Sequence, residues 1–131
     1  MVAKSVSSRK QKGYGFQKKV AEQIRNTFGL EERDIVSTPS SVKGEDLLLS
    51  NKAIECFPFA VEAKRQEKLN IWEALKQTEV NATVMKVKHQ TYFAPLLVFK
   101  RNRSKTYVCL EFNDFLDIVK GCEWLKEGEK E

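Results

Sequence analysis

Apolar residues recur along this chain with two different periods, and the period of each stretch predicts a helix or a strand. A first helix that ends at Gly29 is predicted from apolar residues at every fourth position, Phe16, Val20, Ile24 and Phe28. Residues 59–64, with the sequence FAVEAK, alternate along the chain with a period of two. That period is typical of a strand with one buried face.

Further elements follow from runs of β-branched, aromatic and leucine residues and from residues that cap helices. Four more strands are predicted, at residues 34–37, 45–49, 92–99 and 106–110. Asn70 can cap a second helix that runs to about residue 82 and buries Ile71, Trp72, Leu75 and Thr78. Asn113 can cap a last helix that buries Phe115, Leu116, Val119, Cys122 and Leu125. Residues 50–56 are read as a loop or a single helical turn.

The order of these elements is helix, three strands, helix, two strands, helix, which predicts an α/β fold. We expect one central, mixed, five-stranded sheet flanked by helices, with a crossover helix between two parallel strands. The length of 131 residues fits one domain, expected at residues 13–126. A basic flexible arm is expected at residues 1–12 and a charged tail at residues 127–131.

Composition excludes several classes of protein. No apolar run approaches the roughly 18 residues of a membrane span, and the first residues lack a hydrophobic segment of signal-peptide type, so we expect a cytoplasmic protein without a membrane partner. Three cysteines without a CxxC pair argue against a structural zinc site, and the single His89 excludes a site that needs two histidines. We expect no organic cofactor.

The net charge of +5 is concentrated in two places. Residues 1–19 hold six basic residues and no acid, and a second cluster lies at residues 100–105. Such clusters suit phosphate contacts and salt-dependent binding of nucleic acid. The alternative is that they are solvated and serve only solubility.

Residues 44–64 carry the candidate chemistry. Glu62 and Lys64 point to the same side of the predicted strand, and a hairpin-like return would bring Asp46 beside Glu62. Two carboxylates about 5 Å apart repel by roughly 3 kcal/mol at an effective dielectric of about 20, so such a pair shifts a pKa or binds a hard cation such as Mg²⁺. The alternative is an ordinary charged pair on the solvated face of a strand.

The spacing of these residues also resembles a known signature. Asp46, followed by 15 residues and then Glu62, Ala63 and Lys64, is similar to the motif of the PD-(D/E)xK nuclease superfamily. The predicted order of elements resembles that superfamily's restriction-endonuclease-like αβββαβ core. The segments SSVKGEDLLLS, FPFAVEAKRQEKLNIWEALKQTE and PLLVFKRNRSKTYVCLEFNDFL resemble small phage-encoded nucleases related to Holliday-junction resolvases, a likeness that runs from about residue 13 to residue 116.

The resemblance implies a role for each matching position. Asp46, Glu62 and the backbone carbonyl of Ala63 would bind Mg²⁺ or Mn²⁺, and Lys64 would be the catalytic lysine. Gln77 matches a glutamine that relatives place near the site; its alternative is an ordinary surface position. From the basic clusters and the resemblance together, the residues expected to contact nucleic acid are Arg9, Lys10, Lys12, Lys18, Ser40, Ser41, Lys43, Arg65, Arg101 and Arg103.

One position departs from the resolvase pattern. Many resolvases carry a glutamate on the first helix where this chain has Gln17. Either Glu22 substitutes or the site has two acids, and we favour two because Glu22 lies opposite the apolar stripe of its helix.

These patterns and the resemblance lead to a metal-dependent DNA endonuclease that resolves Holliday junctions or other branched DNA in phage replication or recombination. The resemblance to resolvases also implies a homodimer, because a four-way junction offers two equivalent phosphates. Two alternatives use the same residues. One is a structure-specific or non-specific nuclease of other substrates; the other is a catalytically retired module that only binds nucleic acid.

Overall fold

The computed structural model of the chain describes residues 6–39 and 45–121. Along the chain the elements are α1 (Val6–Phe28), a 3-10 turn (Glu32–Asp34), β1 (Ile35–Ser37), β2 (Leu47–Leu49), α2 (Asn51–Cys56), β3 (Phe59–Arg65), α3 (Ile71–His89), β4 (Ala94–Lys100), β5 (Tyr107–Cys109) and α4 (Phe112–Lys120). The predicted α/β class is confirmed, and residues 50–56 form a helix of under two turns.

The strands form two sheets, so the prediction of one five-stranded sheet is wrong. β1 and β2 pair antiparallel, and β3, β4 and β5 form a separate sheet in which β3 is parallel to β4 and β4 antiparallel to β5. The crossover through α3 is therefore confirmed. β2 is only three residues long and Ser50 directly after it caps α2, so the chain turns away before a ladder between β2 and β3 forms.

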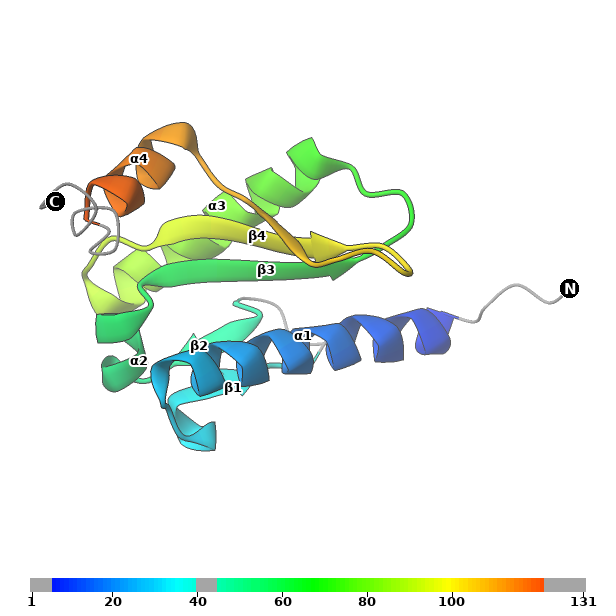
Figure 1. Cartoon of the computed structure of the whole chain (residues 1–131), viewed down its shortest axis with the longest axis horizontal. Helices are drawn as coiled ribbons and strands as arrows, with labels where there is room; N and C mark the ends of the chain where they lie inside the picture. Colours follow the sequence, from blue (N-terminus) through cyan, green and yellow to red (C-terminus); the bar gives the residue numbers. More distant parts are fainter. Residues whose placement is uncertain (1–5, 40–44, 122–131) are drawn as a thin grey trace, which may run out of the picture.

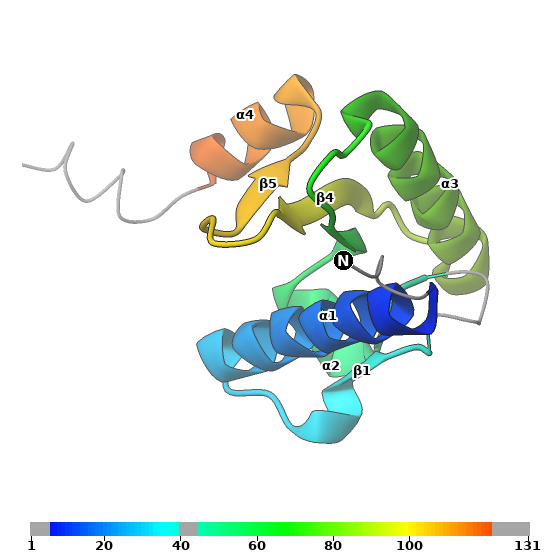
Figure 2. The same ribbon diagram turned by 90° about the vertical axis from the view of Figure 1, so that its right-hand side faces the viewer.

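Helices enclose β3 on its two faces. α3 contacts β3 and β4, while α1 contacts β3 and β1; Figures 1 and 2 show the sheet between these two helices. Four consecutive residues of β3, from Ala60 to Ala63, are buried. Burial of successive residues, which point to opposite faces, is the pattern of a strand covered on both sides. Any charged side chain on this part of β3 is consequently held inside the protein.

The apolar stripe predicted for the first helix forms part of the core. Phe16 and Val20 are buried and Ile24 packs against the core cluster, whereas Phe28 is 44% exposed. α1 begins at Val6, inside the segment expected to be a flexible arm, so the backbone of residues 6–12 is helical. Gly29 follows the helix with φ 64°, the left-handed conformation expected of a C-terminal glycine.

Of the faces predicted for the other two helices, that of α4 is wrong and that of α3 is correct only in part, since Thr78 is buried as expected. α3 buries Ala74, Thr78, Asn81, Ala82 and Met85. Trp72, expected to pack on the sheet, is 82% exposed. Ala74 and Thr78 on the inner face are small, whereas Trp72, near the start of the helix, lies on its solvent side.

α4 is capped by Glu111, not by Asn113. Its residues Phe115, Leu116 and Val119 are exposed by 46%, 45% and 36%, because no other element in residues 6–39 and 45–121 covers that face. Cys122 and Leu125, predicted for the same helix, lie outside the described residues. None of the helices in the described ranges is long and apolar enough to cross a bilayer.

Candidate active site

Asp46 lies directly before β2, and its carboxylate reaches β3. The backbone N–H of Ala63 donates a hydrogen bond of 2.7 Å to Asp46 Oδ2. β3 pairs with another strand only on the side of β4. On its other edge, which faces β2, the Asp46 carboxylate accepts the hydrogen bond of the Ala63 N–H. Asp46 is thereby fixed beside the Glu62–Lys64 segment, although the two strands form no ladder.

The backbone that carries Asp46 is held by α1. Thr38 N–H donates to the Asp46 carbonyl at 2.9 Å, which closes the β1–β2 pair beyond its last registered residues. The side-chain amide of Gln17 donates to the carbonyls of Thr38 and Asp46, each at 2.6 Å. Gln17 is only 5% exposed. A buried amide from the first helix therefore fixes the end of the hairpin from which Asp46 projects.

Glu62 is a buried acid with a partner for each oxygen. It is 5% exposed, lies in the middle of β3 and faces α3. Lys64 Nζ lies 3.3 Å from Glu62 Oε1, and the side-chain amide of Asn81 donates to Oε2 at 2.6 Å. The lysine side chain keeps 33% of its surface exposed, so its ammonium group can reach both the acid and a ligand in solvent.

Burial and the nearby Glu62 disfavour the charged form of Asp46. The pKa of Asp46 is raised from 3.8 to about 7, first because the group is buried and second because Glu62 is negatively charged nearby. The amide of Ala63 and the ammonium of Lys64 act in the opposite direction and do not balance these effects. A cation between the carboxylates would remove the repulsion.

The donor set fits a hard divalent cation. Asp46 and Glu62 offer carboxylate oxygens, which Mg²⁺ prefers, and two such ligands leave room for waters and a phosphate oxygen. Within residues 6–39 and 45–121, no group of three or more His, Cys, Asp or Glu side chains gathers anywhere. In the described part of the chain, the candidate cation site therefore offers two acidic side chains, those of Asp46 and Glu62.

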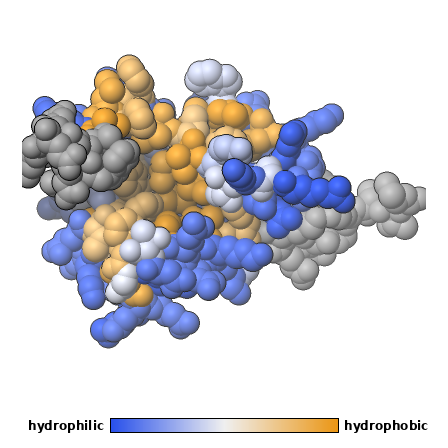
Figure 3. Space-filling model, viewed as in Figure 1, coloured by the Kyte–Doolittle hydropathy of each residue, from blue (hydrophilic) through white to orange (hydrophobic). Residues whose placement is uncertain are grey.

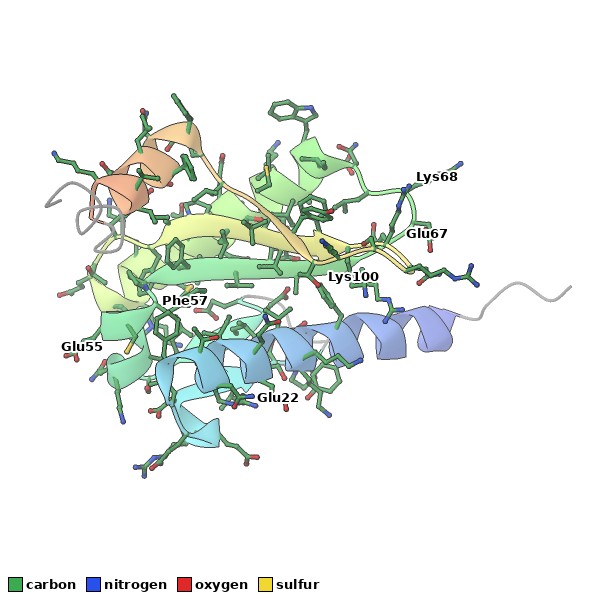
Figure 4. The ribbon with its side chains drawn as sticks, viewed as in Figure 1. Glu22, Glu55, Phe57, Glu67, Lys68 and Lys100 are labelled. Atoms are coloured by element: carbon green, nitrogen blue, oxygen red, sulfur yellow. The ribbon has the colours of Figure 1, made fainter. Side chains whose placement is uncertain are left out.

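The two candidates for a third acid lie differently. Gln17 reaches the site, but its amide hydrogens are directed at backbone carbonyls. A carboxylate could not donate to these carbonyls. Glu22 is exposed on the outer surface of α1, as Figure 4 shows. Within the described residues, two carboxylates lie near each other here, and Gln17 contributes an amide and not a third acid.

Sequence reasoning missed Asn81. It is 1% exposed on the inner face of α3 and contacts Glu62 directly, and Gln77 Nε2 donates to its Oδ1 at 3.1 Å. The available signal was a polar residue in register with Ala74, Thr78 and Met85, which lie on the buried stripe. The predicted core face of this helix includes Thr78, one turn before Asn81, but extends toward Ile71 and Trp72 and not toward Asn81.

Several basic residues gather at the end of the sheet where β3 and β4 finish. Arg65 closes β3 and its guanidinium donates to Asn102 Oδ1 at 3.3 Å, in the loop that also carries Arg101 and Arg103. Figure 4 shows Lys68 and Lys100 at this same end. Lys18 is exposed on α1, with its ammonium 5.0 Å from the centre of the Tyr14 ring.

The other residues expected to contact nucleic acid are less defined. Arg9, Lys10 and Lys12 belong to the first turns of α1. Ser40, Ser41 and Lys43 lie outside the described residues, in the connection between β1 and β2.

Comparison with known proteins gives one match. No curated protein and no solved structure was found to be similar to this chain. The family model described as "Phage putative PDDEXK endonuclease" matches residues 8–124, a range that contains the acids, the lysine and both amides of the site. This match confirms the resemblance to phage PD-(D/E)xK nucleases, and the chain belongs to this endonuclease family.

Proposed function

We propose that this protein is a Mg²⁺-dependent DNA endonuclease that cuts branched DNA. One observation carries the proposal: Asp46, directly before β2, accepts a hydrogen bond from the Ala63 amide on β3, where the neighbouring Glu62 is buried with the ammonium of Lys64 3.3 Å from its Oε1. An ordinary surface pair would not bury one acid to 5% exposure and raise the pKa of the other to about 7. Both features cost stability, and a cation would relieve them.

Each residue has a distinct role in this proposal. Asp46, Glu62 and the carbonyl of Ala63 would hold the cation. When bound, Mg²⁺ supplies positive charge beside the phosphate and lowers the pKa of its water. Lys64 either stabilises the charge that develops on the phosphate oxygens or orients the attacking water. A new bond forms between the water oxygen and phosphorus, and one phosphodiester P–O bond breaks, which leaves a phosphate monoester and a hydroxyl group.

Gln77 also stays in the proposed site. It is exposed, and its amide donates to Asn81. Its own oxygen is an acceptor that could receive a hydrogen bond from water or substrate. We therefore keep it as a candidate catalytic residue on α3.

DNA is the proposed substrate because of the charge around the site. Lys64 and Arg65 sit at the end of β3, and Arg101 and Arg103 lie in the adjoining loop. Cations along such an edge neutralise successive phosphates and release counterions. The basic residues of α1 and of the segment 40–44 complete the proposed DNA surface: Arg9, Lys10, Lys12, Lys18, Ser40, Ser41 and Lys43.

We also propose that the protein acts as a homodimer, which would present two equivalent sites to a four-way junction. Support comes from the apolar surface of α4 and β5, where Phe112 is 69% exposed and Tyr107 and Val108 are each 55% exposed. Figure 3 shows apolar surface over α4 that continues across the neighbouring strands. Exposed patches of this kind often mark protein interfaces. The mass in solution, measured by sedimentation, tests this.

A panel of substrates tests the function. Four-way junction, flap, linear duplex and single-stranded RNA of related sequence are incubated with the protein at one salt concentration, with Mg²⁺ or with EDTA. We expect Mg²⁺-dependent cutting that is fastest on the junction. Glu62→Gln, which keeps the side-chain volume and removes the charge, serves as the control and should not cut.

The other results distinguish the alternatives. Faster cutting of linear duplex, flap or RNA would contradict the junction assignment and favour a nuclease of that substrate. Salt-dependent binding of all the DNAs without any Mg²⁺-dependent cutting would favour a module that only binds nucleic acid. Equal cutting by the parent and Glu62→Gln would reject the active site itself.

A further inference from the structure

Asn81 is an unusual residue for its place in the fold. It lies in the middle of α3, where asparagine is a poorer helix former than alanine, and it is 1% exposed. Its neighbours on the buried stripe, Ala74, Ala82 and Met85, are apolar. A buried amide is unfavourable unless its hydrogen bonds are made. Packing therefore does not explain this residue, whereas its two hydrogen bonds do.

The hydrogen bonds around Asn81 run in one direction. The ionised carboxylate of Glu62 can only accept, so Asn81 must turn its NH₂ group toward Oε2, where the distance is 2.6 Å. The Asn81 oxygen then faces Gln77, whose NH₂ group donates to it at 3.1 Å. Gln77 thus fixes the orientation of Asn81, and Asn81 fixes the orientation of Glu62.

This arrangement gives the two oxygens of the Glu62 carboxylate different partners. Oε2 is occupied by α3 through Asn81, and Oε1 is the oxygen that faces Lys64 at 3.3 Å. Without Asn81 the carboxylate could rotate, or it could turn both oxygens toward Lys64 and Asp46. A ligand whose orientation is fixed before the cation arrives binds it more tightly, because less ordering is required on binding.

We propose that Asn81 is a positioning residue that orients Glu62 for cation binding, with Gln77 as its support. This inference rests on the proposed function. It assigns to the inner face of α3 a part in the site that the motif residues on β2 and β3 do not supply. The role is indirect, since Asn81 is held to Glu62 and not to the substrate.

Mn²⁺ binding by the otherwise metal-free protein, measured by calorimetry, tests the inference without relying on activity. Asn81→Leu keeps the approximate volume and removes the donor, and we expect Mn²⁺ to bind about 10- to 100-fold more weakly. Asn81→Gln restores a donor on a longer side chain and should recover part of the affinity. All variants are measured well below their melting temperatures, so that a loss of stability does not appear as a loss of binding.

Thr78→Val is the matched control. Thr78 is buried on the same face of α3 one turn earlier, and its hydroxyl donates to the Ala74 carbonyl, not to Glu62. Its removal should leave the Mn²⁺ affinity unchanged. Equal affinity in the parent and Asn81→Leu would overturn the inference alone, as would an equal loss in Thr78→Val. A parent that binds no Mn²⁺ would overturn the proposed function and this inference with it.

Discussion

At the scale of single residues, the candidate site consists of one half-buried acid and one buried acid, each held by an amide. Gln17 fixes the backbone of Asp46, and Asn81 fixes the side chain of Glu62. The positions of the acids and Lys64 could be predicted, because the two-residue period of a strand and the spacing of the motif are visible in the sequence. The amides could not, because their partners are 29 and 19 residues away and depend on how the helices pack.

Asp46→Asn should make the metal-free protein more stable, by an amount that grows with pH. In the unfolded chain the Asp46 carboxyl loses its proton near 3.8, whereas in the folded protein its pKa is about 7. Between these values unfolding releases a proton, so the parent loses stability as pH rises from about 4 to about 7 and then levels off. The asparagine can still accept from the Ala63 amide and carries no charge.

The measurement is urea unfolding of both proteins in EDTA at a series of pH values. We expect little difference at pH 4 and a gain of about 1 to 4 kcal/mol for Asp46→Asn at pH 8. A difference that did not change with pH, or an Asp46→Asn protein that was less stable at pH 8, would show that burial and Glu62 do not destabilise the charged form of Asp46.

At the scale of elements, local patterns predicted the strands and the first helix better than the way in which they pack. The four-residue period placed Phe16 and Val20 correctly in the core. The two sheets were not foreseen, because the separation of β2 from β3 depends on a side chain, that of Asp46, at the edge where a ladder would lie. The inner face of α3 was predicted correctly at Thr78 but not at Trp72, because the small or polar Ala74 and Asn81 are buried while the larger Trp72 is exposed.

Gln17 should be required to join α1 to the β1–β2 pair. Gln17→Leu removes the donor to the Thr38 and Asp46 carbonyls and should cost about 1 to 3 kcal/mol in the free energy of unfolding. Gln17→Glu should cost more at pH 8, because its carboxylate would face two carbonyl oxygens. Urea unfolding in EDTA measures both effects.

Gln23, exposed on the same helix, provides the control. Gln23→Leu and Gln23→Glu should change the free energy of unfolding by less than about 0.5 kcal/mol. If Gln17→Glu proved as stable as Gln23→Glu, the amide would have no positioning role, and a third acid would be tolerated at the site.

At the scale of the whole molecule, one end carries the chemistry and another surface is apolar. Lys68, Lys100 and Arg65 gather where β3 and β4 end, whereas exposed apolar residues lie on α4 and β5 and also on α3, where Trp72 is 82% exposed. In the proposed function, this separation would allow DNA to approach the site while a second copy of the chain covered the apolar surface. The basic surface could be predicted from the charge clusters in the sequence. The exposed apolar surface of α4 could not, because the periodicity of its apolar residues predicts a buried face.

We propose that Asp46 and Glu62 are both required to bind the cation that supports DNA cleavage. The most direct test is the Mg²⁺-dependent rate of junction cleavage by the parent, Asp46→Asn and Glu62→Gln, with each protein confirmed to be folded. We predict that the parent cuts and that each substitution lowers the rate by at least about 100-fold. Undiminished cleavage by either variant would contradict the account.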